Sequence, residues 1–175
     1  MPVSLTFNRA LGALGLWSLL MAPASALSLG ERAPAFSATT LSGEPVALAE
    51  VFGKRPVYLK FWATWCRYCV YELPHAQSLY DAYGEQVLVL MVNVGLNDSE
   101  ENIRRVYAEQ GVNLPTIIDT DGDIVAHYGV VGTPNHVLID TEGRVQYRTF
   151  LATDELDRQV AELAQSQRQP QEVRP

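Results

Sequence analysis

The sequence is poor in the residues and patterns that mark several common classes of protein. It has 13 basic residues against 20 acidic ones, so we do not expect nucleic acid as a partner. It has two cysteines and three histidines, and the histidines (His75, His127 and His136) lack the spacing of metal ligands, so no metal site is expected. No internal repeat, collagen-like pattern or coiled-coil pattern is present. The length is that of one globular domain of ordinary size.

The chain also lacks an apolar run of the roughly 20 residues that a membrane span needs. Residues 10–21 form a shorter run, which follows Arg9 and precedes the small residues Ala24-Ser25-Ala26. This order is typical of a secretory signal peptide. We expect cleavage after Ala26 and a location in the periplasm or cell envelope. The alternative is an uncleaved N-terminal anchor.

The rest of the chain predicts a single domain over residues 27–165 and a polar, disordered tail over 166–175. Strands are predicted at 36–40, 45–48, 57–62, 87–94, 116–119, 136–140 and 145–150, and helices at 70–83, 98–110 and from 153 onward. Pro74 lies inside the first helix and predicts a kink or a break there. The alternation predicts an α/β fold with a mainly parallel, mixed central sheet and helices on both faces.

The two cysteines, Cys66 and Cys69, stand three residues apart where a strand candidate runs into a helix. Cys66 would occupy the helix N-terminus, where unpaired N–H groups and the helix dipole stabilise a thiolate and depress its pKa. Cys69 would lie one turn deeper. We therefore expect Cys66 to attack a disulfide of a partner and Cys69 to resolve the mixed disulfide.

Other interpretations of the cysteine pair stay open at this point. A purely stabilising disulfide is disfavoured, because a four-residue loop would contribute only about 2 kcal/mol against about 4.7 for a loop of 100 residues. A Cu(I)-binding metallochaperone is an alternative, since two thiolates are soft ligands. A disulfide oxidase or isomerase is another. A peroxiredoxin is disfavoured, because Ala63 stands where that family has threonine.

The motifs together resemble the thioredoxin superfamily, and within it the exported TlpA/ResA/CcmG branch. The likeness covers about residues 30–165. It is carried by the run from Phe61 to Cys69 with Glu72-Leu73-Pro74 after it, by residues 91–95 and 111–122, and by Gly132-Thr133-Pro134 before an apolar strand. The resemblance implies a thioredoxin fold with an N-terminal β-hairpin and a central βα insertion.

The resemblance also implies roles for residues around the cysteines. It implies a cis peptide bond between Thr133 and Pro134 beside the cysteines, with the Thr133 backbone bonding to a substrate peptide. Trp65 would belong to an exposed apolar surface that meets client proteins, with Trp62 packed nearby.

Glu72 matches an acidic residue of that branch and lies one helical turn after Cys69. A partly buried carboxyl there could take the proton of a thiol, and we expect desolvation to raise its pKa. The alternative is a surface glutamate.

Three positions depart from the residues that related proteins carry, and the first two bear on the redox potential. Lys60 replaces an acidic residue of cytoplasmic thioredoxins, and either pairs with Glu72 beneath the site or extends its amine to the surface. Arg67 and Tyr68 stand between the cysteines, and Arg67 favours the Cys66 thiolate. His136 either lines the client groove or, as we expect, occupies a solvent-facing strand position. The sequence leaves the potential open.

These observations predict an exported thiol:disulfide oxidoreductase that acts as a reductant of protein disulfides. The resemblance suggests apocytochrome c or copper-delivery proteins as clients, and a membrane reductase of the CcdA/DsbD kind as the electron donor. We expect a monomer whose redox group is the Cys66–Cys69 pair, with no added cofactor.

Overall fold

The structure, a computed structural model, describes residues 27–168. The predicted signal peptide and its cleavage position lie outside this range, as does the tail after residue 168. Within the described range, no helix has both the length and the apolar character that crossing a membrane requires. The elements are β1 (Ser37–Thr39), β2 (Pro45–Ala47), α1 (Leu48–Val51), β3 (Val57–Trp62), α2 (Arg67–Tyr71), α3 (Leu73–Tyr83), β4 (Leu88–Asn93), α4 (Glu100–Gln110), β5 (Thr116–Ile118), α5 (Asp123–His127), β6 (Asn135–Ile139), β7 (Val145–Thr149) and α6 (Asp154–Arg168).

Five strands form the mixed central sheet that the alternation of elements predicts, in the order β5-β4-β3-β6-β7. Strands β3, β4 and β5 run parallel, whereas β6 is antiparallel to β3 and β7 is antiparallel to β6. The hairpin β1–β2 forms a separate two-stranded sheet and is joined to β5 by a bond from the Leu41 N–H to the Thr116 carbonyl. The fold prediction of a mixed α/β sheet with an N-terminal hairpin is confirmed.

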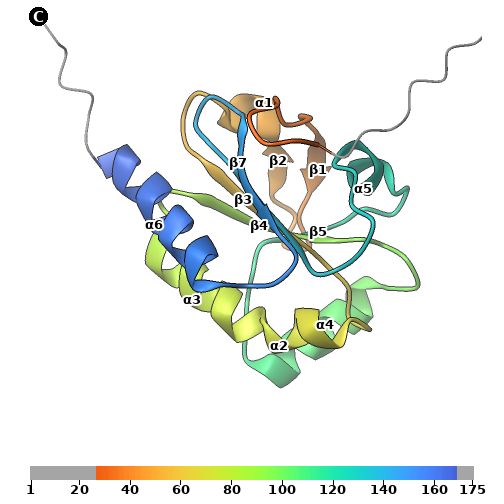
Figure 1. Cartoon of the computed structure of the whole chain (residues 1–175). Coiled ribbons are helices and arrows are strands. Elements are labelled where there is room, and N and C mark those ends of the chain that lie inside the picture. Colours follow the sequence, from red (N-terminus) through yellow and green to blue (C-terminus); the bar gives the residue numbers. More distant parts are fainter. Residues whose placement is uncertain (1–26, 169–175) are drawn as a thin grey trace, which may run out of the picture.

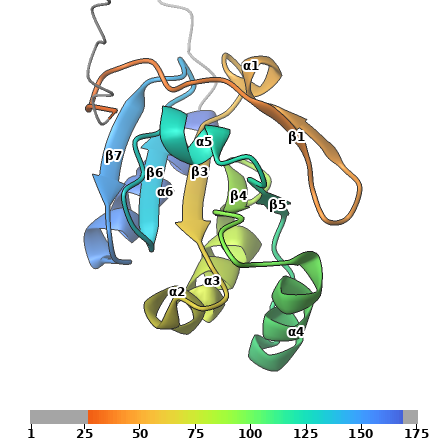
Figure 2. The same cartoon turned by 90° about the vertical axis from the view of Figure 1, so that its right-hand side faces the viewer.

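Helices cover both faces of the sheet, and the central strand β3 contributes alternate side chains to each face (Figures 1 and 2). Leu59 and Phe61 pack in a cluster with residues of the hairpin and of the segment around α5. Tyr58 packs against α3 and α6, and Trp62 packs against residues of α3 and α4. Figure 2 shows β3 pointing toward α2, so the residues that follow β3 lie at that end of the sheet.

The predicted break at Pro74 divides the helix after the cysteines into two. Helix α2 ends at Tyr71, Glu72 is its C-cap, and α3 begins at Leu73 with Pro74 in its first turn. Proline is tolerated there because the first-turn N–H groups have no partner within the helix. The break places the Glu72 side chain at the junction of α2 and α3.

Two short helices were not predicted, and the last helix ends later than predicted. Helix α1 has four residues and begins at Leu48, the last residue of the strand predicted at 45–48, and helix α5 has five residues in a segment for which no element was predicted. Helix α6 continues to Arg168, so the predicted disorder from residue 166 is wrong for its first three residues. The added turn is held where the Gln167 amide donates to the Thr141 hydroxyl at 2.8 Å.

Arg148 on β7 braces the chain that leads from α5 into β6. Its guanidinium donates to the Asn135 side chain at 3.0 Å and to the carbonyls of Tyr128 and Gly129 at 2.9 and 3.2 Å. A guanidinium presents several donors in a fixed fork, which suits three acceptors on neighbouring segments. Arg148 thereby fixes the segment that carries Thr133 and Pro134.

We expect Arg148→Lys to lower the free energy of unfolding by about 1–2 kcal/mol, because one ammonium cannot reach all three acceptors. Urea denaturation measures the loss. Arg105→Lys is the matched control, since Arg105 is exposed and its side chain bonds, among residues 27–168, only to Asn102, and it should change stability by less than about 0.5 kcal/mol. Equal effects of the two substitutions would contradict a bracing role for Arg148.

Candidate active site

The two cysteines form a disulfide at the start of α2, directly after the turn that follows β3. Cys66 is the N-cap of α2, and its sulfur accepts a bond from the Cys69 N–H at 3.2 Å. The residues differ in access, because Cys66 is 8% exposed whereas Cys69 is fully buried. A sulfur at a helix N-terminus receives unpaired N–H groups and the positive end of the helix dipole, which favour its thiolate once the disulfide is reduced.

The turn before the cysteines is fastened to the loop after β4. The Asp98 carboxylate accepts from the Thr64 N–H and hydroxyl, both at 2.8 Å, and from the Asn93 amide at 2.7 Å. Burial alone would raise the pKa of Asp98, but these bonds outweigh it and lower the pKa. The Trp65 indole N–H donates to the Leu96 carbonyl at 2.8 Å. Sequence reasoning missed Asp98 as a site residue, because only the pairing of β3 with β4 brings it to Thr64.

Thr133 and Pro134 lie at the same end of the sheet as the cysteines. Their peptide bond is cis, as the resemblance implied. Pro134 directly precedes β6, and Asn135 of β6 pairs with Phe61 of β3 near the end from which β3 runs to the cysteines.

The Glu72 carboxylate is buried between the cysteine helix and the sheet and is bonded to three groups. It forms an ion pair with the Lys60 amine, which is itself 1% exposed, so the pairing alternative for Lys60 is the correct one. It also bonds to the His136 ring at 3.2 Å and accepts from the Ala152 N–H at 2.8 Å. Burial alone would raise the pKa of Glu72, but the bonds from His136, Lys60 and Ala152 together lower it to about 2. The expected rise in this pKa is therefore wrong.

His136 does not face solvent, so the expected position of this residue is also wrong. It is fully buried on β6, directly opposite Lys60 of β3, and its ring lies between Glu72 and Tyr58. The Tyr58 hydroxyl meets the His136 Nδ1 at 2.7 Å. The strand is covered because α3 and α6 pack over this face of the sheet. The sequence shows only that His136 and Lys60 are each a polar residue within an otherwise apolar strand, and it is the register of β3 with β6 that places them opposite each other.

Exposed apolar side chains gather around the cysteines. Within the described range, the large exposed apolar side chains other than Leu29 sit on the turn before α2, on α2 itself, after the ends of β4 and β7, and before the cis bond: Trp65, Tyr68, Tyr71, Leu96, Val131, Phe150 and Leu151. The strand registers place these segments at one end of the sheet. An apolar surface at this end suits contact with a protein chain.

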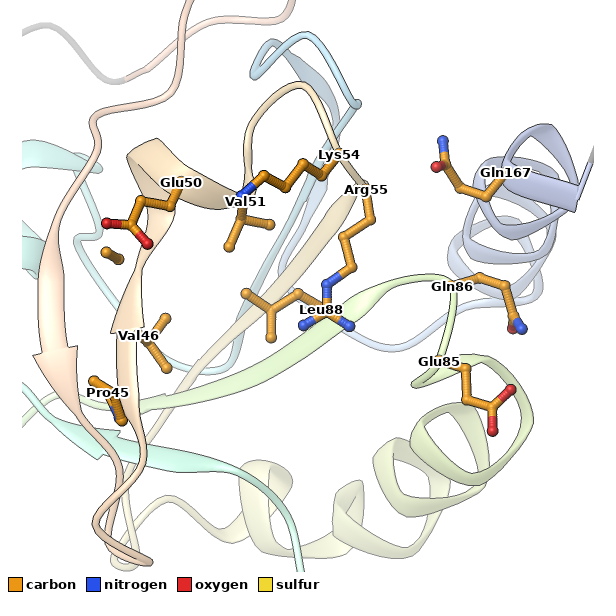
Figure 3. A pocket seen from close by; sticks show the side chains of 11 residues that line it. Pro45, Val46, Glu50, Val51, Lys54, Arg55, Glu85, Gln86, Leu88 and Gln167 are labelled. Carbon is orange, nitrogen blue, oxygen red and sulfur yellow. The ribbon is translucent and has the colours of Figure 1, made fainter. Parts of the chain in front are cut away.

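A pocket of about 590 Å³ lies at the opposite end of the sheet (Figure 3). It is lined by the start of β4 and the chain before β3, including Leu88, Lys54 and Arg55, and by Glu50 of α1. None of the residues that line it belongs to the cysteine site. This pocket is therefore separate from the cysteine site.

We expect Glu72→Gln to lower the free energy of unfolding by about 3 kcal/mol near neutral pH, because it leaves Lys60 buried without its counter-charge. Lys60→Met combined with Glu72→Gln should recover most of the loss. Since the pKa of Glu72 lies below its ordinary value of 4.5, the wild type should lose this stabilisation as pH falls from about 4.5 toward 2. Urea denaturation across this pH range measures both effects.

The control for this experiment is Glu100→Gln, which breaks the exposed pair of Glu100 with Arg104 and should cost less than about 1 kcal/mol. The buried pair is not stabilising if Glu72→Gln lowers the free energy of unfolding as little as this control does. It is also not stabilising if the double variant loses stability between pH 4.5 and 2 as steeply as the wild type does.

Comparison with known proteins agrees with this geometry. Residues 29–148 match the profile of the AhpC/TSA family. The chain is 33% identical over 119 residues to the thiol-disulfide oxidoreductase ResA of Bacillus thuringiensis subsp. konkukian, with 68% of each chain covered.

Two solved structures are similar in fold and sequence. The thioredoxin domain of a thiol-disulfide oxidoreductase from Bacteroides vulgatus has a TM-score of 0.69 at 26% identity, covering 79% of this chain and 99% of that domain. A secreted Mycobacterium tuberculosis disulfide oxidoreductase, homologous to E. coli DsbE, has a TM-score of 0.63 at 30% identity, covering 73% of this chain and 96% of that one. This chain thus belongs to the AhpC/TSA family and, within it, to the thioredoxin-like thiol-disulfide oxidoreductases.

Proposed function

We propose that this protein is an exported thiol-disulfide oxidoreductase that reduces disulfides in client proteins. The observation that carries the proposal is the Cys66–Cys69 disulfide at the N-terminus of α2, with only Cys66 reaching the surface. The secretory pattern in residues 1–26 supports export. The apolar side chains around the cysteines support a protein as substrate.

The reaction follows from the unequal access of the two sulfurs. In the reduced protein, the Cys66 thiolate attacks one sulfur of a client disulfide, forms a mixed disulfide and releases one client thiolate. The Cys69 thiolate then attacks the Cys66 sulfur, which restores the Cys66–Cys69 disulfide and releases the second client sulfur. Two electrons pass to the client, and the dithiol itself is the only redox group needed.

The proposal also covers the identity of the client and of the electron donor. Apocytochrome c and copper-delivery proteins are the client types that the resemblance suggests, since both present cysteine pairs that must be reduced. A membrane reductase of the CcdA/DsbD kind would return two electrons to the Cys66–Cys69 disulfide. We propose that the protein works as a monomer, with the apolar surface around Trp65 and the backbone of Thr133 receiving the client.

Cys69→Ser should trap the client on Cys66, because the resolving thiol is absent. Expressed in the cell envelope of its own host, this variant should give a mixed disulfide on non-reducing gels, and mass spectrometry of the adduct identifies the client. Cys66→Ser is the matched control and should give no adduct, since Cys69 is fully buried. Adducts on Cys66→Ser and none on Cys69→Ser would reverse the proposed roles.

The redox potential of the pair tests the direction of electron flow. We expect a value nearer to the roughly −270 mV of thioredoxin than to the roughly −120 mV of DsbA. Because Arg67 is exposed beside Cys66, Arg67→Ala should lower the potential by no more than about 20 mV, and Arg105→Ala should leave it unchanged. Equilibration with glutathione or dithiothreitol buffers gives both values. A potential near −120 mV would make the protein an oxidant.

Copper binding is the outcome that would favour a different function. Tight one-to-one binding of Cu(I) by the reduced protein, together with no reduction of insulin disulfides, would indicate a metallochaperone.

A further inference from the structure

Four polar side chains form a continuous buried chain of contacts beneath the cysteine helix, and the reaction steps above use none of them. Tyr58 meets His136 at 2.7 Å, His136 meets Glu72 at 3.2 Å, and Glu72 pairs with Lys60. All four are buried. Tyr58 and His136 also stack, with ring centroids 5.9 Å apart and planes 14° from parallel.

The donors and acceptors of this chain follow from the charge of Glu72. A carboxylate only accepts, so the His136 Nε2 carries the proton and donates it to Glu72. The Nδ1 of the same neutral ring is then an acceptor, and the Tyr58 hydroxyl donates to it. Burial lowers the pKa of His136, which agrees with a neutral ring. Tyr58 thus fixes the tautomer of His136, and His136 fixes one oxygen of Glu72.

The titratable groups that face this cluster come from four segments. Strand β3 contributes Tyr58 and Lys60, and the junction of α2 and α3 contributes Glu72. Farther out, His75 of α3 pairs with Asp157 of α6 at 2.9 Å, and both side chains are partly exposed. The charge of His75 acts on His136 and that of Asp157 acts on Tyr58.

We propose that His136, held in its tautomer by Tyr58, is a positioning residue for disulfide exchange: it keeps the Glu72 carboxylate ionised and oriented at the end of the cysteine helix. The inference rests on the proposed function. In the resolution step the Cys69 sulfur bonds to the Cys66 sulfur and the bond between Cys66 and the client breaks. The Glu72 carboxylate first takes the proton of the Cys69 thiol, so that Cys69 attacks as a thiolate, and then gives this proton to the departing client sulfur. Glu72 is ionised before and after, and charge is conserved.

Two substitutions of His136 that are nearly equal in size should have different effects, because they keep different hydrogen bonds. A glutamine at position 136 can place its amide where the His136 Nε2 lies, so His136→Gln keeps the donor to Glu72. An asparagine reaches only the Nδ1 position, so His136→Asn keeps a partner for Tyr58 and removes the donor to Glu72. Tyr58→Phe retains the packed ring and removes only the hydroxyl that fixes the tautomer.

The kinetic test uses the reduced full-length protein and Ellman's disulfide, which releases one thionitrobenzoate when Cys66 attacks and a second when Cys69 resolves. For His136→Asn, the ratio of its second-phase rate to that of the wild type should be near one at pH 8 and fall several-fold below pH 5. The ratio for His136→Gln should stay near one throughout. Tyr58→Phe should fall between the two. The first phase should be unchanged in all three variants.

A second measurement does not depend on activity. Carbon-13 NMR of the Glu72 carboxyl should show a midpoint below pH 3 in the wild type and in His136→Gln, and above pH 4 in His136→Asn. A pH-independent rate ratio for His136→Asn together with an unshifted Glu72 midpoint would overturn the positioning role. Absence of the first kinetic phase in the wild type would instead overturn the proposed function, so the two failures are distinguishable.

Discussion

The burial of one carboxylate, that of Glu72, is the constraint on which the arrangement of the site depends. An ionised carboxylate withdrawn from water is costly unless charged and hydrogen-bonding partners surround it. The partners come from three other segments: Lys60 from β3, His136 from β6 and the Ala152 N–H from the link between β7 and α6. Because Glu72 lies at the break between α2 and α3, satisfying it fixes the cysteine helix against the sheet.

The end of the sheet at which β3 runs to the cysteines also holds the backbone segments and the exposed apolar side chains that thiol–disulfide exchange needs. Strand β3 leads into the turn that makes Cys66 a helix cap, and Asp98 holds that turn from the loop after β4. Arg148 holds the chain before Pro134 from β7. The turn before the cysteines is thus held from the loop after β4, and the segment before the cis-proline is held from β7, while the apolar side chains around the cysteines remain at the surface. Such a site is shaped to contact another protein and to expose one sulfur to it.

Some features of the site follow from residues that are neighbours in the sequence, and others follow from how the strands pair and in what register. The placement of Cys66 at a helix start and the break at Pro74 follow from neighbours in the chain, and both agree with the structure. The burial of His136 and the bonds of Asp98 depend on which strands pair and in what register, which the sequence does not state. The pKa of Glu72 was expected to rise because its burial could be foreseen and its three partners could not.

Because Glu72 has a buried counter-charge and two further hydrogen-bonding partners, it should stay ionised beneath the cysteines whether the disulfide is closed or open. This can be measured by the infrared difference spectrum between the oxidised and reduced protein at neutral pH. We expect no gain of a protonated carboxyl band on reduction. A protonated carboxyl band that appears on reduction, and is missing in Glu72→Gln, would contradict it.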